Sequence, residues 1–319
     1  AANTAALLLA IHPYTVYHDA ALYHTFLSTA LLLGGFLLLF TGIETKRFAH
    51  LFWSGLLFGL CVLILSTIVP FVGLLIVAGL VAWKITLKSR VILVAAFVLG
   101  LSLGWGPWIV RNAIVFHNFI PLTTESGVTL WVGNSPYAKK LLPTQEQEAT
   151  PVPDGTAFNF PERYAGCVVS KCRGGVTEHE ENKALTALAI NWIKTHPKDF
   201  VELTVWRYAN IWSPYLTPNK TFFTLHTLDI LVTYGYFVWN ILLFIFFVIG
   251  ARLAWREKKY LELILPVALA LSATCAFALF LYYTKYRIPF EAVLLSITGA
   301  GGAVIYKNSK LGSLTKRIK

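Results

Sequence analysis

Long apolar runs separated by short polar segments dominate the chain. A helix needs about 20 mostly apolar residues to cross a hydrocarbon core of about 30 Å. Measured against that length, five runs predict one membrane span each: 20–43, 91–108, 228–251, 261–283 and 288–306. Residues 4–12 predict the end of a further span that is already under way.

The apolar run 51–83 is too long for one crossing and short for two. Pro70, which follows Ser66 and Thr67, offers a break because proline lacks a backbone donor and disfavours helix at the residue before it. We therefore expect two short spans at about 49–67 and 70–87, which makes seven whole spans after the partial one.

Charge supports this count of spans. With alternate loops placed inside, about half of the 27 lysines and arginines fall in four inner segments, 44–50, 84–90, 252–259 and 307–319. Short cytoplasmic loops collect such cations. A single helix over 51–83 would place the cations of 84–90 on the outer side of the membrane, against this rule. The net charge of +11 therefore reflects how the chain is oriented in the membrane. It does not indicate nucleic-acid binding, because basic and aromatic residues form no patch outside these loops.

Composition agrees with a membrane protein and excludes a soluble enzyme. The 319 residues are 56% hydrophobic and 13% charged, with a mean hydropathy of +0.62. We expect an all-α polytopic protein of the cell (plasma or inner) membrane with four parts: an N-terminal bundle (1–108), a nearly neutral, mixed extracytoplasmic segment (109–227), a three-span bundle (228–306) and a basic cytoplasmic tail (307–319). Because the sequence contains no Met, we also expect it to begin inside a longer product.

The extracytoplasmic segment predicts both extended and helical structure. Phe119–Pro136 alternates β-forming residues with Gly and Asn and predicts a hairpin or irregular strand pair. A helical pattern begins at Glu178, and a second amphipathic helix covers Lys198–Trp212. The Trp-bearing apolar face of the second helix suits either the membrane interface or packing against the rest of the segment.

The four cysteines divide into two pairs. Cys61 and Cys275 lie in predicted spans, where a small apolar role is the default. Cys167 and Cys172 lie in the outer segment, where a disulfide is chemically permitted. No second Cys or His pair completes a metal site, so the sequence signals no cofactor and no divalent metal.

Polar and charged residues cluster at the predicted outer ends of the spans. Such groups are costly near lipid and are functional candidates by default. The candidates are His18, Asp19, Arg111, Asn112, Glu125, Asn134, Lys285, Arg287 and Glu291. Asp19 has the alternative role of a helix N-cap.

The segment KYRIPFE (285–291) is the sharpest of these clusters and allows two interpretations. Arg287 and Glu291 are four residues apart, so on a helix they share a face and can neutralise each other. Alternatively, Arg287, Lys285 and Arg111 form a cationic pocket that grips a lipid phosphate, since guanidinium binds phosphate in two-point fashion.

Several stretches resemble one family. PWIVRN (107–112), FIPLTTESGVTLWVGNSPYA (119–138), HPKDFVELTVWRYANIWSP (196–214), YTKYRIPFE (283–291) and HPYTVYHDAALYHTFLSTALLL (12–33) occur in an order similar to that of the membrane glycosyltransferases with a GT-C fold. That group uses polyprenyl-phosphate sugars and includes protein O-mannosyltransferases and lipid A aminoarabinose transferases. The resemblance covers nearly the whole chain.

The resemblance implies a transferase that moves a sugar from a polyprenyl-phosphate carrier to a lipid, glycan or protein acceptor on the outer face, usually with inversion. It places the catalytic carboxylate, a general base on the acceptor hydroxyl, in an outer loop upstream of residue 1. It implies that Arg111, Lys285 and Arg287 hold the carrier phosphate, and that His18 and Asp19 neighbour the active site.

Two other classes of protein remain open. A transporter or flippase of lipid-linked sugars also has many spans, but it usually shows internal repeats and charges at mid-bilayer depth. We find no repeat, and the charges gather at one predicted face. A non-catalytic membrane scaffold explains the large outer segment equally well, but it leaves the cations at the outer ends of the spans unexplained.

Overall fold

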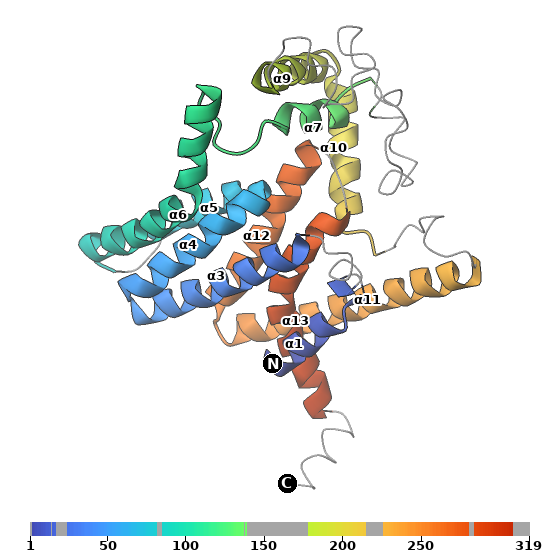
Figure 1. The fold of residues 1–319 in the computed structure, drawn as a ribbon. Helices are drawn as coiled ribbons and strands as arrows, with labels where there is room; N and C mark the ends of the chain where they lie inside the picture. Colours follow the sequence, from blue (N-terminus) through green and yellow to red (C-terminus); the bar gives the residue numbers. More distant parts are fainter. Residues whose placement is uncertain are drawn as a thin grey trace. The chain divides into compact units, whose positions relative to one another are not determined.

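The structure is a computed structural model that describes residues 2–13, 15–16, 24–81, 85–136, 138, 178–214, 226–280 and 284–308. Within these ranges the chain forms helices and no strand (Figure 1). The helices are α1 (Ala2–Ala10), α3 (Thr25–Thr45), α4 (Phe48–Ile64), η1 (Ser66–Ile68), α5 (Val69–Val81), α6 (Leu87–Phe116), α7 (Ser126–Gly133), α9 (Glu178–Thr195), α10 (Pro197–Ile211), α11 (His226–Arg256), α12 (Tyr260–Leu279), η4 (Thr284–Arg287) and α13 (Ile288–Asn308).

Among the described helices, 5 are long and apolar enough to cross a membrane: α3, α6, the Tyr234–Arg256 part of α11, α12 and the Ile288–Ile305 part of α13. This confirms a multi-pass, all-α membrane protein. The two remaining apolar helices, α4 and α5, have 17 and 13 residues and are shorter than a usual span. The total of seven spans therefore stays a prediction.

The long apolar run does divide into two helices, as predicted. The chain leaves α4 at Leu65, whose backbone is not helical (φ −133°, ψ 76°), and η1 connects it to α5. Pro70 is the second residue of α5, a position at which a missing N–H breaks no hydrogen bond of the helix. Proline thus lies in the first turn of the second helix, and the break at Leu65 lies five residues before it.

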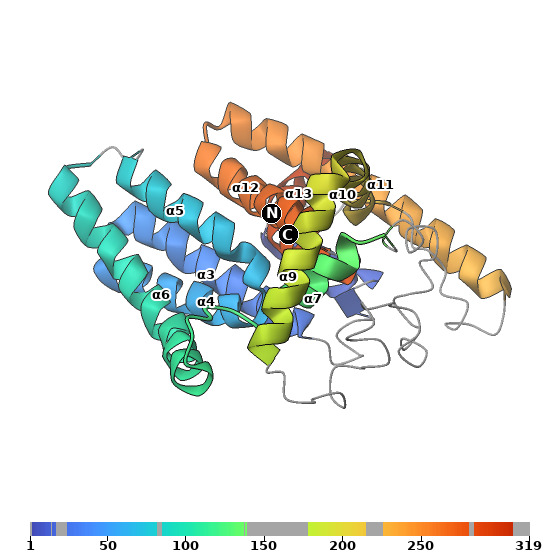
Figure 2. The same ribbon diagram turned by 90° about the horizontal axis from the view of Figure 1, so that it is seen from above.

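The chain separates into two compact units, and the first contains most of the apolar helices. It comprises Ala1–Val115, Val238–Thr274 and Thr284–Lys319. Both views show α3, α4 and α5 side by side (Figures 1 and 2). Four phenylalanines join these helices to α6 through ring contacts at 5.6 to 5.8 Å between centroids: Phe36 with Phe58, Phe36 with Phe71, and Phe58 with Phe97.

Small residues let the helix backbones of this unit touch. A Cβ atom on Gly55 of α4 would lie 2.0 Å from the carbonyl oxygen of Phe97, and one on Gly100 of α6 would lie 1.9 Å from that of Phe52. Gly59 and Gly104 repeat this contact one turn further along. Two small-xxx-small stripes therefore face each other where α4 crosses α6, the packing that membrane helices favour in the absence of a hydrophobic driving force.

The second unit comprises Phe116–Phe237 with Cys275–Tyr283. The helices predicted from Glu178 and over Lys198–Trp212 are confirmed as α9 and α10. They share one apolar core with α7, whose buried members are Trp131, Ala138, Leu185, Ala189, Trp192 and Leu203. Since Leu203 of α10 is in this core, the structure favours packing over membrane contact for that part of α10.

The predicted strand pair at Phe119–Pro136 is wrong, because this segment contains the helix α7. Helical geometry turns Trp131 into the core of the second unit, where α9 packs against it. Gly127 permits the close approach, since a Cβ atom there would lie 2.1 Å from the carbonyl oxygen of Asn182. Burial of Trp131 outweighs the β-propensity of the sequence.

Candidate functional site

The short helix η4 and the first turn of α13 position the central side chains of the site. η4 ends at Arg287, and Pro289 occupies the first turn of α13, where a proline fits without loss of a hydrogen bond. Glu291 follows in the same turn. Residues four apart on a helix share a face, so the two charged side chains of Arg287 and Glu291 meet.

Arg287 and Glu291 form a buried ion pair. Arg287 Nε lies 2.8 Å from Glu291 Oε1, and the exposed fractions of the two side chains are 2% and 13%. Screening by water is weak at such burial, so the Coulomb attraction between the two charges is stronger than in an exposed pair. The interpretation in which the two charges neutralise each other is therefore what the structure shows.

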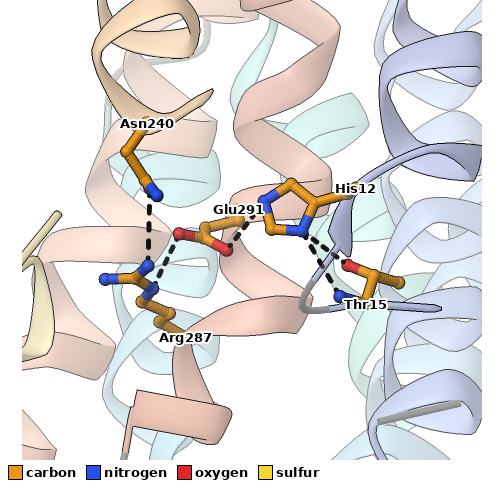
Figure 3. Close-up of polar contacts among 5 residues, drawn as sticks. All are labelled: His12, Thr15, Asn240, Arg287 and Glu291. Atoms are coloured by element: carbon orange, nitrogen blue, oxygen red, sulfur yellow. Dashed lines mark hydrogen bonds and ion pairs between the residues drawn. The ribbon is translucent and has the colours of Figure 1, made fainter. Parts of the chain in front are cut away.

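Two other segments of the first unit extend this pair into a chain of contacts (Figure 3). Asn240 of α11 accepts a hydrogen bond from Arg287 Nη2 at 3.4 Å. On the opposite side, Nε2 of the buried His12 lies 3.6 Å from Glu291 Oε2. His12 in turn accepts the backbone N–H of Thr15 at its Nδ1, at 3.3 Å. We call these five residues the Arg287 cluster.

The contact with Thr15 determines where the proton of a neutral His12 lies. Because Nδ1 accepts an N–H, the proton must be on Nε2, which faces Glu291. Glu291 is therefore approached by a guanidinium on one oxygen and by an N–H group on the other.

Aromatic rings lie beside the Arg287 cluster and next to it in the sequence. The ring of Trp239 on α11 meets His12 edge-on, with 6.0 Å between centroids. His24, directly before α3, lies 6.2 Å from Tyr286 of η4. The end of α1, the start of α3, one side of α11 and the start of α13 thus meet at this place. A guanidinium, a carboxylate and an imidazole are together here among mostly apolar helices.

Arg111 and Asn112 contact each other near the end of α6. Arg111 is exposed, lies over the ring of Trp108 at 5.1 Å and donates to Asn112 Oδ1 at 2.9 Å. Asn112 is buried. Both views draw the last turns of α6 apart from η4 and the start of α13 (Figures 1 and 2). The pocket shared by Arg111, Lys285 and Arg287 therefore stays a prediction.

Glu125 and Asn134 lie at opposite ends of α7 in the second unit. Glu125 is exposed. The buried Asn134 donates its amide N–H groups to the carbonyl oxygens of Leu130 and Leu279, at 3.0 and 2.9 Å. Asn134 thus connects the end of α7 to the end of α12, which is a structural role.

A buried arginine that the sequence did not single out, Arg207 of α10, completes this connection. It donates to the carbonyl oxygens of Gly133 and Ala278, the latter at 3.1 Å, and lies 3.5 Å from Asn134 Oδ1. Burial lowers the pKa of the Arg207 guanidinium to about 10. The sequence contained one signal for this burial, the spacing of the apolar residues. Arg207 lies four residues from both Leu203 and Ile211, which mark the apolar face of α10.

Several predicted residues lie outside the described part of the chain. These are His18, Asp19, Cys167 and Cys172, and for Lys285 the structure describes the backbone, as part of η4. The two described cysteines are free, Cys61 buried and Cys275 exposed. Across the described ranges no group of three or more His, Cys, Asp or Glu side chains is placed to hold a metal ion.

Comparison with known proteins adds no assignment. No family model, no curated protein and no solved structure matches this chain.

Proposed function

We propose that this chain belongs to a membrane glycosyltransferase that moves a sugar from a polyprenyl-phosphate carrier to an acceptor on the outer face of the membrane. The resemblance of several stretches to transferases of the GT-C group supports this proposal. So does the multi-pass, all-α architecture, which brings the end of α1 to the segment KYRIPFE.

The observation that carries the proposal is the burial of Arg287 in an apolar bundle. Its side chain is 2% exposed, and its guanidinium is held by Glu291 and Asn240. Placing a permanent cation among membrane helices is costly, and proteins keep such residues mainly where a ligand or a moving charge requires them. A planar guanidinium suits a phosphate with two oxygens presented together.

In this proposal Glu291 is the counter-ion of Arg287 while no donor is bound. The carrier phosphate then competes with Glu291 for the guanidinium. As the sugar leaves, negative charge builds on the phosphate, and a fixed cation stabilises that charge. The general base that accepts the proton from the acceptor hydroxyl is not assigned to any residue of the Arg287 cluster.

Binding of a polyprenyl-phosphate analogue tests the role of Arg287. Arg287→Ala should weaken binding to the reconstituted chain by about 2 kcal/mol or more, because a buried charge-assisted contact is lost. Calorimetry or fluorescence titration measures the affinity. Arg256→Ala, which removes an exposed cation from the end of α11, is the matched control and should leave the affinity unchanged.

Glu291→Gln should change the affinity in the opposite direction, and it distinguishes a role of the pair in phosphate binding from a purely structural role. Glutamine keeps the shape of the side chain but removes the charge that competes with phosphate, so the affinity for the analogue should rise. A purely structural pair predicts a different result, namely that both Arg287→Ala and Glu291→Gln lower the unfolding temperature and neither changes binding. That result would favour a non-catalytic scaffold, in which the two charges serve only to compensate each other.

A further inference from the structure

A second feature of the first unit lies apart from the Arg287 cluster. Helices α3, α4, α5, α6 and α12 surround a partly open cavity of about 390 Å³. Every lining residue is apolar; they include Leu39, Ile43, Leu75, Ala78, Leu93 and Leu265. The lining offers no hydrogen-bonding side chain to a polar ligand.

Such a space needs an apolar occupant. A much smaller apolar cavity, of about 150 Å³, stays dry and binds benzene, because water finds no partners in it. An empty space is unfavourable in proportion to its volume, since the lining atoms lose their contacts. In a helix bundle within a bilayer, the hydrocarbon at hand is a lipid chain.

The cavity lies toward the end of the bundle that the charge pattern predicts to be cytoplasmic. Ile43 is in the last turn of α3, so Lys46 and Arg47 follow it within one turn. Leu261 is in the first turn of α12, two residues after Lys259 and three after Lys258. These four exposed cations lie within a few residues of the lining residues Ile43 and Leu261, and we call them the rim.

The rim keeps a positive balance although acids are present. Glu44, Glu257 and Glu262 also lie at these helix ends, and Glu257 pairs with Lys259 at 3.1 Å on the surface. Trp255 and Tyr260 contact each other beside this pair, with 5.1 Å between ring centroids. Aromatic residues of this kind are typical of the level of the lipid headgroups. Cations at that level attract anionic headgroups.

We propose that this cavity is a binding site for one acyl chain of an anionic glycerophospholipid of the inner leaflet, with the lipid phosphate held by the cations of the rim. In this proposal the apolar lining binds the acyl chain, and the four cations of the rim bind the headgroup. This site is separate from the donor site proposed above and does not depend on it.

Native mass spectrometry of the full chain tests the site. The chain is reconstituted with equal amounts of dioleoyl phosphatidylglycerol and dioleoyl phosphatidylcholine and then released into mild detergent. We expect retention of one phosphatidylglycerol in clear preference to phosphatidylcholine. Equal retention of both lipids would overturn the proposal.

Two substitutions on α5 test where the acyl chain lies. Ala78→Phe places a ring in the cavity and should abolish retention of phosphatidylglycerol. Val77→Phe, on the neighbouring exposed position, adds a ring outside the cavity and should leave it unchanged. If Ala78→Phe retains as much lipid as Val77→Phe, the chain does not occupy the cavity.

Removal of rim charges tests the headgroup without filling the cavity. The double change Lys46→Gln and Lys258→Gln should lower the preference for phosphatidylglycerol, by about fivefold for each cation removed. Lys194→Gln, in the exposed last turn of α9, is the control. Arg287→Ala should not affect this preference, so failure here and failure of the proposed donor site can be told apart. An unchanged preference in the double variant would remove the headgroup part of the proposal.

Discussion

At the scale of single residues, Arg207 shows how a buried charge can be structural. Its guanidinium satisfies carbonyl oxygens at the ends of α7 and α12. Arg207→Leu should destabilise the fold by about 3 kcal/mol, because it leaves buried carbonyl groups without donors. Lys198→Leu, at an exposed position of the same helix, should change stability by less than about 0.5 kcal/mol. Chemical unfolding in detergent measures both, and equal effects would show that the contacts of Arg207 contribute little.

Residue spacing accounts for what could be foreseen of the Arg287 cluster. The separation of Arg287 and Glu291 predicts their contact on any helix. Spacing could not predict His12 and Asn240, because they reach the pair from distant parts of the chain. A weaker signal was present for Asn240, which interrupts the apolar run of α11. A polar residue at such a position usually faces a partner inside the bundle.

At the scale of helices, the close crossing of α4 and α6 depends on glycine residues, which have no side chain to keep the two backbones apart. Gly100→Ala would set a methyl group against the backbone of α4, so we expect a loss of about 1–3 kcal/mol in stability. Gly106→Ala, on the same helix with nothing within 4 Å of the added atom, is the control. It should be neutral or slightly stabilising, since alanine favours helix over glycine. Thermal unfolding of the two variants compares them, and equal melting temperatures would contradict this packing.

The helices themselves were foreseen to different degrees. Apolar length predicted α3, α6, α11, α12 and α13, because the requirement to bury backbone polar groups in lipid leaves helix as the main solution. The segment of α7 was assigned wrongly from its β-forming residues. Its helix is stabilised by contacts with α9, which local sequence does not reveal.

At the scale of the whole molecule, the short helices α4 and α5 decide the topology. If both cross the membrane, the turn at η1 reaches the outer face, and a cysteine in place of Ser66 should react with an impermeant thiol reagent added from outside. The background for this test is a variant in which all four native cysteines are serine. A cysteine in place of Lys46 should react only from inside. Labelling of Ser66→Cys from neither side would show that α4 and α5 enter the bilayer without crossing it.

The intrahelical pairing of Arg287 with Glu291 also bears on the order in which the protein is assembled. Both charges belong to the segment that begins α13, so their compensation does not wait for α1 or α11 to arrive. The charges of Arg287 and Glu291 can therefore already compensate each other when α13 leaves the translocation machinery, and His12 and Asn240 join the pair afterwards. A reporter that scores membrane insertion of the isolated α13 segment should give lower efficiency for Glu291→Gln than for the native segment. Equal efficiency would mean that the charges are compensated only after the bundle has closed.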